Sequence, residues 1–152
     1  MTILQPEHVD FLNGTRRAVL GTIAAGGSPR LVPICFAVLD GPLGPIIVSA
    51  LDEKPKRGAD PRELARVRDL IVRPRVSLLV DRWDDDWEKL AWLRIEATAT
   101  LVEPGHPDHG DALIALRARY EPYRTQRLEL NPLIRFEPIR TVWWSGAVDP
   151  TR

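Results

Sequence analysis

The segment from Ala91 to Val102, AWLRIEATATLV, restricts the fold more than any other part of the sequence. Its apolar and polar residues alternate without interruption, and the apolar set is Leu93, Ile95, Ala97, Ala99 and Leu101. A period of two is typical of a β-strand with one face against a core. A strand of this length with one dry face favours an antiparallel sheet or barrel.

Shorter apolar runs between turn residues predict the rest of the sheet. We expect strands at 17–24, 31–39, 46–50, 76–81, 133–136 and 141–144. The glycines at 26–27 and the segment DGPLGP predict tight turns, so the first three strands would form an antiparallel meander. Because Pro33 cannot donate to a strand ladder, we expect its strand to lie at an edge or to contain a bulge.

Helices are predicted at 5–14, 60–73 and 107–120. The second has the clearest signals, because Asp60 is a suitable N-cap and Glu63 completes a capping-box pattern. Leu64, Val67 and Ile71 would form its apolar face. Arg66 would then lie on a different side of the helix.

These elements predict a mainly β fold of the α+β class, with about six antiparallel strands and two or three helices. The chain has 152 residues, which suits a single domain over 1–152 with its own core. A closed or nearly closed barrel is favoured over a parallel sheet. The sequence contains no G-x-G-x-x-G motif and no strand–helix–strand rhythm, so a Rossmann domain is not expected.

Composition excludes several classes of protein. The 21 basic residues balance the 21 acidic residues, which argues against a general nucleic-acid binder. One cysteine excludes an internal disulfide. The sequence has no apolar run of about 18 residues and no basic, apolar leader at its start, so we expect a cytoplasmic protein that does not span a membrane.

A cationic cluster follows the third predicted strand. It contains Lys54, Lys56 and Arg57, and Arg66 follows on the next predicted helix. Solvated loop charge is one interpretation. The other is an anion site, because Lys and Arg bind phosphate and a helix N-terminus adds free N–H groups. Both interpretations remain open from the residues alone.

No other segment predicts catalytic or metal chemistry. HPDHGD, which starts at His106, reads as a helix entry rather than a zinc site, and DRWDDDW lacks the glycine and terminal glutamate of a calcium loop. Cys35 lies in an apolar run, as an inert buried thiol does, and no triad pattern occurs. We therefore expect no metal and no catalytic side chain, and any redox chemistry would come from a bound cofactor.

Three segments together carry a family resemblance from about Phe11 to the C-terminal WWSG. They are RRAVLGTIAAGGSPRLVPICFAVLDG, IIVSALDEKPKR and LARVRDLIVRPRVSLLVDRWDDDWEKLAWLRIEATATLVE. This ordered set resembles the pyridoxamine 5′-phosphate oxidase-like superfamily of flavin and deazaflavin oxidoreductases. Within it, the chain is similar to the small proteins regarded as deazaflavin-dependent enzymes.

The resemblance implies a split β-barrel of the FMN-binding-protein type, which forms a homodimer with coenzyme F420 or FMN at the subunit interface. The implied ring site consists of Val32, Pro33, Ile34, Ser49 and Ala50. The implied phosphate ligands are Lys54, Lys56 and Arg57, with Arg66 as a further candidate. Trp143 and Trp144 would approach the ring bound by the partner subunit.

The implied activity is hydride transfer to or from a small organic substrate. The end of the chain, RTVWWSGAVDPTR, lacks the arginine-based substrate motif of the true pyridoxamine phosphate oxidases, so vitamin B6 oxidation is not expected. Arginine supplies 18 of the 21 basic residues, which fits a GC-rich actinobacterial origin, where deazaflavins occur. One alternative is a non-catalytic flavin- or haem-binding carrier or sensor on the same barrel. Another, an oligonucleotide-binding barrel, conflicts with zero net charge and with the aspartates at 84–86.

Overall fold

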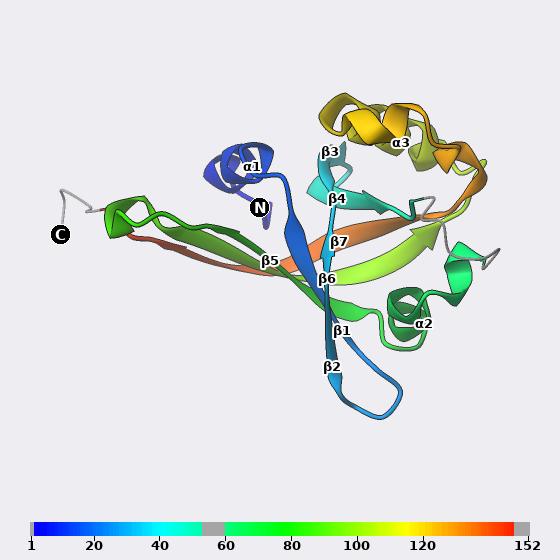
Figure 1. The fold of residues 1–152 in the computed structure, drawn as a ribbon, viewed down its shortest axis with the longest axis horizontal. Helices are drawn as coiled ribbons and strands as arrows, with labels where there is room; N and C mark the ends of the chain where they lie inside the picture. The colour runs from blue at the N-terminus through cyan, green and yellow to red at the C-terminus, as the bar shows by residue number, and fades with distance from the viewer. Residues whose placement is uncertain (1, 53–59, 148–152) are drawn as a thin grey trace.

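The computed structural model describes residues 2–52 and 60–147 (Figure 1). Its strands are β1 (Ala18–Ile23), β2 (Pro29–Ile34), β3 (Ala37–Gly41), β4 (Gly44–Ala50), β5 (Arg75–Arg82), β6 (Ala91–Val102) and β7 (Leu133–Ser145). Its α-helices are α1 (Pro6–Asn13), α2 (Ala65–Val72) and α3 (Pro107–Arg119). Short 3₁₀ helices are η1 (Pro61–Glu63), η2 (Trp87–Lys89), η3 (Glu121–Arg124) and η4 (Leu128–Leu130). None of the helices in these ranges is both long and apolar enough to cross a membrane.

The seven strands form one antiparallel sheet in the order β2-β1-β5-β6-β7-β4-β3. The two edge strands, β2 and β3, are consecutive in the chain, and only Cys35 and Phe36 lie between them. Such a short link cannot cross an open seven-stranded sheet, because a fully extended residue spans only about 3.5 Å. The sheet must therefore curl until its edges meet. The expected α+β fold with a split β-barrel is confirmed.

The link between β2 and β3 also corrects the predicted meander. The run 31–39 is not one strand, and β2 pairs with β1 while β3 pairs with β4. The two hairpins consequently lie at opposite edges of the sheet. The prediction that Pro33 lies on an edge strand is confirmed, because β2 is paired only with β1.

Near the end of the chain, two strands were expected where the structure has one. The runs 133–136 and 141–144 form a single strand, β7, which pairs with β6 along its whole length. Its register shifts near Glu96 and Ala97, where Ile139 has no partner in β6. A bulge of this kind keeps pairing continuous while the strand bends. The bulge lies between the two predicted strands, where polar residues interrupt the apolar pattern of β7.

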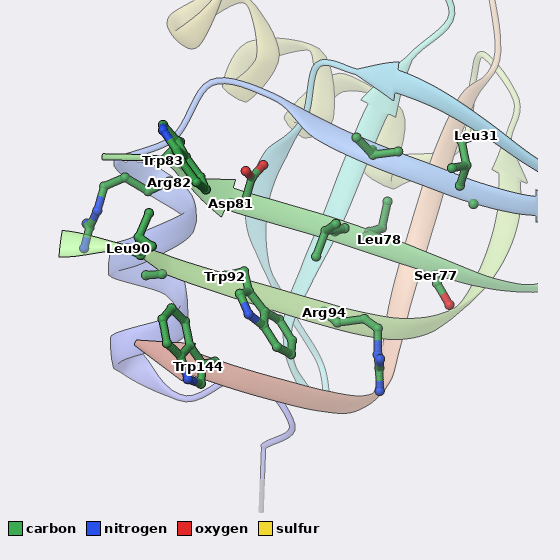
Figure 2. Close-up of a pocket in the computed structure, with 14 residues that line it drawn as sticks. Leu31, Ser77, Leu78, Asp81, Arg82, Trp83, Leu90, Trp92, Arg94 and Trp144 are labelled. Carbon is green, nitrogen blue, oxygen red and sulfur yellow. The ribbon is translucent and has the colours of Figure 1, made fainter. Parts of the chain in front are cut away.

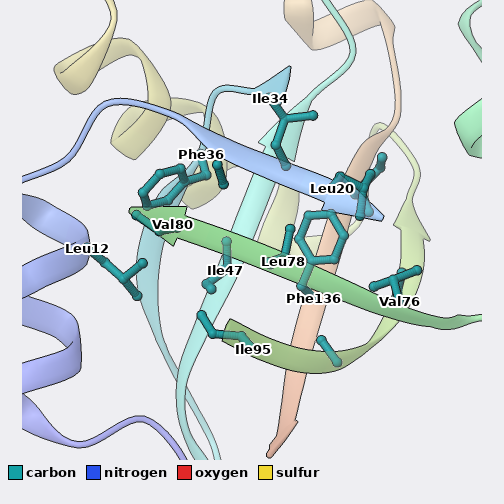
Figure 3. Close-up of a cluster of buried hydrophobic side chains, with 14 of the residues drawn as sticks. Leu12, Leu20, Ile34, Phe36, Ile47, Val76, Leu78, Val80, Ile95 and Phe136 are labelled. Carbon is teal, nitrogen blue, oxygen red and sulfur yellow. The ribbon is translucent and has the colours of Figure 1, made fainter. Parts of the chain in front are cut away.

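The main core fills the inside of the curled sheet (Figure 3). The alternation predicted for β6 is confirmed, because Leu93, Ile95 and Ala97 are fully buried and their neighbours are not. Phe36 and Phe136 are likewise fully buried. A second cluster lies where α3 covers the outer side of β3 and β4.

The predicted helix over 60–73 is divided by Leu64, whose backbone is extended (φ −56°, ψ 138°). Residues Pro61–Glu63 form η1, and α2 begins only at Ala65. The buried residues of α2 are Val67, Asp69 and Leu70, whereas Ile71 is 60% exposed. The prediction of Ile71 as a core residue was therefore wrong.

Asp69 joins α2 to the β1–β2 hairpin. Its Oδ2 accepts hydrogen bonds from Thr22 Oγ1 and from Arg30 Nε, each at 2.8 Å. Thr22 and Arg30 are direct cross-strand partners. Burial alone would raise the pKa of Asp69, but these hydrogen bonds, with the charges of Arg30 and Arg68, hold it below its usual value.

The low pKa of Asp69 predicts acid lability. Its contribution to stability is complete above the unfolded-state pKa of about 3.9 and is lost as the pH falls through the lower folded-state pKa. We expect Asp69→Asn to lower the free energy of unfolding by about 1–2 kcal/mol at pH 7, since Arg30 is partly exposed and its ion pair is screened. Urea unfolding of the wild type and of Asp69→Asn at pH 7 and pH 2 checks this. If the two proteins differ in the free energy of unfolding by the same amount at both pH values, the prediction is contradicted.

Candidate functional site

A pocket of about 210 Å³ lies where the ends of β2 and β4 approach α2. We name it the Arg66 pocket. Its lining combines apolar strand residues with two guanidinium groups, a carboxylate, a thiol and a phenol. The lining residues are Arg17, Pro33, Ile34, Cys35, Ser49, Ala50, Asp52, Arg66 and Tyr123.

The closure of the barrel brings the two strand ends together. β2 ends at Ile34 and β4 at Ala50, and these strands are not paired with each other. Ser49 Oγ connects them by donating to the carbonyl oxygen of Cys35 at 2.7 Å. Because this bond uses the hydroxyl proton, Ser49 can offer a ligand only its oxygen lone pairs.

Arg66 is the electrostatic centre of this pocket. Its side chain is half-buried, and within the described residues its Nε is buried without a hydrogen-bond partner. Burial lowers the pKa of Arg66, and the nearby Asp52 and Tyr123 oppose that shift. Since arginine stays protonated in proteins, the result is a poorly solvated cation. A buried donor without a partner costs about 1–3 kcal/mol, which a bound anion would recover.

Tyr123 and Cys35 form the polar floor of the Arg66 pocket. Tyr123 is 5% exposed. Burial, and secondly its hydrogen bond to Cys35, raise the pKa of Tyr123, so its hydroxyl stays protonated. The floor therefore carries a neutral phenol next to a thiol.

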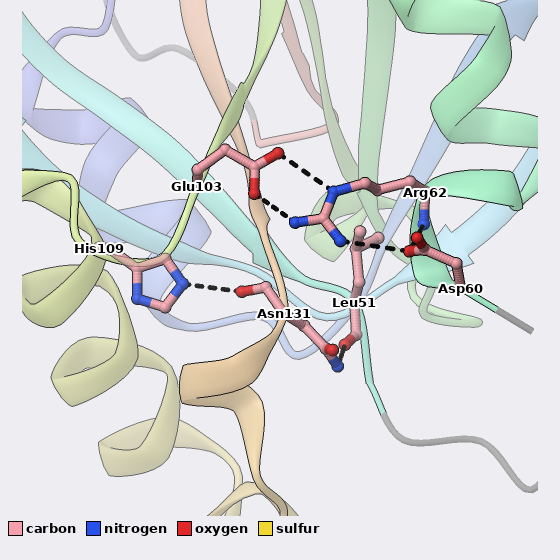
Figure 4. Close-up of polar contacts among 6 residues, drawn as sticks. All are labelled: Leu51, Asp60, Arg62, Glu103, His109 and Asn131. Atoms are coloured by element: carbon pink, nitrogen blue, oxygen red, sulfur yellow. Dashed lines mark hydrogen bonds and ion pairs between the residues drawn. The ribbon is translucent and has the colours of Figure 1, made fainter. Parts of the chain in front are cut away.

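The predicted phosphate ligands Lys54, Lys56 and Arg57 lie outside the described residues. The structure does show how both sides of segment 53–59 are held (Figure 4). Before it, Asn131 Nδ2 donates to the carbonyl oxygen of Leu51 at 3.1 Å, and the Asn131 carbonyl is 2.8 Å from His109 Nε2.

After segment 53–59, Arg62 forms ion pairs with Glu103 and with Asp60, and its Nε lies 3.2 Å from Glu103 Oε1. Asp52, the last residue described before the segment, lines the Arg66 pocket. The chain thus enters the cationic segment from the edge of this pocket.

Five of the predicted site residues come together in this pocket. They are Pro33, Ile34, Ser49, Ala50 and Arg66. Val32 does not line the pocket, and its partly buried side chain packs against the main core.

The two tryptophans near the end of β7 also point to opposite sides of the sheet. Trp143 packs edge-on against Phe11 of α1, with ring centroids 4.8 Å apart, and its ring centroid lies 6.0 Å from that of His8. Trp144 lines a separate hollow on the outer side of the sheet. Both side chains are partly exposed, at 38% for Trp143 and 43% for Trp144, but of the two only Trp144 lines this hollow.

This hollow, which we name the open sheet face, has a volume of about 550 Å³ (Figure 2). It extends over β1, β5 and β6, with Leu31 from β2 and Trp144 from β7, and its lining is mostly apolar. Leu31 and Trp83 are 73% and 71% exposed. Exposed apolar surface of this extent marks an interaction site.

Sequence reasoning missed four residues of the Arg66 pocket. Arg17, Cys35, Asp52 and Tyr123 come from the chain before β1, the link after β2, the end of β4 and η3. Cys35 follows the predicted residue Ile34 directly and Asp52 lies two residues after Ala50, so extending each predicted site by two residues would have found them. Arg17 and Tyr123 reach the pocket only through the tertiary fold.

The two histidines of the segment HPDHGD make local polar contacts. His106 caps α3 by accepting from the Asp108 N–H at 3.1 Å, while His109 points to Asn131. Among the residues that the structure describes, no three His, Cys, Asp or Glu side chains lie together in a way that could hold a metal ion.

Comparisons with known proteins agree with this architecture. Rv2991, a conserved hypothetical protein from Mycobacterium tuberculosis, is 25% identical, with a TM-score of 0.74 over 93% of this chain and 84% of that chain. HutZ, the heme storage protein from Vibrio cholerae, is 18% identical, with a TM-score of 0.64 over 95% of each chain. An F420 reductase is 18% identical, with a TM-score of 0.59 over 84% of this chain and 89% of that chain.

None of the curated proteins matches the chain. Residues 4–138, however, match the sequence profile of the family described as Pyridoxamine 5'-phosphate oxidase. That range extends from the start of the N-terminal helical region into β7 and includes every described residue of the Arg66 pocket. The chain therefore belongs to the pyridoxamine 5′-phosphate oxidase family.

Proposed function

We propose that this protein is an oxidoreductase that binds coenzyme F420 or FMN in the Arg66 pocket and acts as a homodimer on a small organic substrate. The observation that carries the proposal is the Nε of Arg66, which is buried without a hydrogen-bond partner among the described residues, in a pocket that also contains four of the five predicted ring-site residues. A phosphate group would satisfy this donor and neutralise the charge.

The residues of the pocket fit such a cofactor. Pro33, Ile34 and Ala50 offer apolar surface to a flat ring, and Ser49 can accept a hydrogen bond from a ring N–H. Arg66 and Arg17 would hold the anionic part, together with the cationic segment 53–59. When bound, the cofactor supplies the hydride chemistry, and the chain binds, orients and shields it.

A second copy of the chain is proposed to cover the site. In the sheet register Pro33 lies opposite Val19, and Val19 lies opposite Leu79. Directly paired residues point to the same side of a sheet. Pro33 thus places the Arg66 pocket at the β2 end of the open sheet face, and a partner that covered this face would also cover the pocket.

The composition of the open sheet face favours self-association. Its apolar centre includes Leu79 and Trp92, and Asp81 and Arg94 lie beside them. In an interface between two identical copies related by a two-fold axis the same patch meets itself, so a surface that carries both charge signs can form ion pairs across it. Burying this apolar area would supply the hydrophobic driving force.

Haem binding is the alternative that the same fold allows. None of the three histidines lines the Arg66 pocket or the open sheet face, and Cys35 is the only described thiol there. No observation on the described residues favours haem over a phosphorylated ring. A haemin titration alongside the cofactors compares the two directly.

Cofactor affinity tests the proposed role of Arg66. When the purified protein is titrated with FMN and with coenzyme F420, the fluorescence signal should show saturable binding of at least one of them. Arg66→Ala should weaken that binding about 10- to 100-fold, because it removes a charged hydrogen bond to phosphate. Arg140→Ala is the matched control, since Arg140 is 65% exposed on β7 and lines neither the Arg66 pocket nor the open sheet face, and the affinity of this variant should equal that of the wild type.

Two results would overturn this assignment. One is that neither coloured cofactor binds at micromolar concentration. The other is that Arg66→Ala binds as tightly as the wild type, which would remove Arg66 from the site. Haemin binding that excludes both cofactors would favour the carrier alternative.

The second prediction concerns assembly. The wild-type protein should be a dimer at micromolar concentration by light scattering, and Leu79→Arg should make it monomeric, because an unpaired charge would be buried in the interface. Leu43→Arg is the control, since Leu43 is 80% exposed at the β3–β4 turn, outside the open sheet face. A monomeric wild type, or a dimeric Leu79→Arg variant, would contradict this interface.

A further inference from the structure

Arg66 reaches its pocket from α2, a helix of eight residues. Two buried side chains, Val67 and Leu70, pack this helix against the main core. These apolar contacts fix which face of the helix meets the core, but because they are not directional they restrain a small rotation less than a hydrogen bond does. With side-chain tips about 5–6 Å from the helix axis, rotation by a tenth of a turn would move a tip by roughly 3 Å. That displacement is enough to break a hydrogen bond.

A directional contact lies one helical turn beyond Arg66. Asp69 is 8% exposed, and its Oδ2 accepts from both Thr22 and Arg30 at 2.8 Å. These two donors come from neighbouring strands at the same level of the β1–β2 hairpin. A carboxylate oxygen bonded to two strands at once cannot turn far about the helix axis.

The C-terminal end of α2 is tied to the same hairpin. Arg73 Nη1 donates to the carbonyl oxygen of Ala24 at 2.7 Å, where the turn between β1 and β2 begins. At its other end, β2 contributes Pro33 and Ile34 to the Arg66 pocket. The hairpin and α2 are therefore one unit that supplies both the apolar wall and the cation of the pocket.

We propose that Asp69 is a positioning residue that holds Arg66 at the distance from which it binds the cofactor phosphate. This inference rests on the proposed function of the Arg66 pocket. Asp69 itself does not line the pocket, so its effect on the ligand passes through α2. Arg30, whose side chain forms the ion pair with Asp69, does not line the pocket either.

The test separates the phosphate from the ring. FMN and riboflavin differ only by the phosphate, so the ratio of their dissociation constants measures the contribution of the phosphate. Coenzyme F420 differs from its deazariboflavin chromophore by the phosphate and the acidic tail attached to it, so the ratio for that pair measures the contribution of the whole anionic part. We would determine this ratio for the wild type, Asp69→Asn, Arg66→Ala and the double variant, with the pair that the wild type binds.

We expect Asp69→Asn to reduce the preference for the phosphorylated ligand about 3- to 30-fold while the affinity for the phosphate-free ligand stays unchanged. In the Arg66→Ala background, Asp69→Asn should cause no further loss, because the residue through which it acts is absent. Arg30→Ala is the second variant. It keeps the Thr22–Asp69 hydrogen bond and should reduce the preference for the phosphorylated ligand less than Asp69→Asn does. Glu137→Gln is the control, since it removes an ion pair with Arg135 on β7, away from α2.

The outcomes that contradict the inference are distinct from failure of the proposed function. If Asp69→Asn weakens both ligands of a pair equally, or if its effect adds fully to that of Arg66→Ala, Asp69 has only a structural role. If the wild type does not prefer the phosphorylated ligand and Arg66→Ala changes nothing, the proposed phosphate site itself is wrong, and this inference is wrong with it.

Discussion

The link formed by Cys35 and Phe36 is the constraint on which the rest of the structure depends. It joins the two edges of a seven-stranded sheet, so the sheet has to curl into a barrel. Curling places the ends of β2 and β4 side by side, although they are not paired. The bond from Ser49 Oγ to the Cys35 carbonyl oxygen connects them at that point. The Arg66 pocket is therefore a direct consequence of how the barrel closes.

The pocket also departs from what stability alone would favour. Buried donors are normally paired, and an unpaired one costs free energy. The guanidinium groups of Arg30 and Arg62 are paired with Asp69 and Glu103. Among the described residues, the Nε atoms of Arg66, Arg119 and Arg135 are buried without a hydrogen-bond partner, and of these three arginines only Arg66 lines this pocket. Such departures from local consistency are expected at binding sites.

The parts of the fold that depend on local pattern could be predicted from the sequence. The alternation in β6 and the helix signals around Pro107 need only neighbouring residues. The predicted meander was wrong because the local pattern of 31–39 does not show where the strand ends. Only Cys35 and Phe36 separate two strands that lie at opposite edges of the sheet. The same limit applies to the site. Pro33 and Ser49 were inferred from family resemblance, whereas Arg17 and Tyr123 are more than a hundred residues apart and meet only in the folded protein.

The size of the pocket connects the site to assembly. A single chain encloses about 210 Å³ there, whereas ligand sites generally measure about 300–1,000 Å³. A tricyclic cofactor with a phosphate would therefore extend beyond the Arg66 pocket. Pro33, Val19 and Leu79 form a continuous row on the outer side of the sheet, so the extension leads onto the open sheet face. If a second copy covers this face, it shields the ring from water, which hydride transfer requires. Binding of the cofactor and formation of the dimer would then stabilise each other, because each completes a surface that the other leaves open.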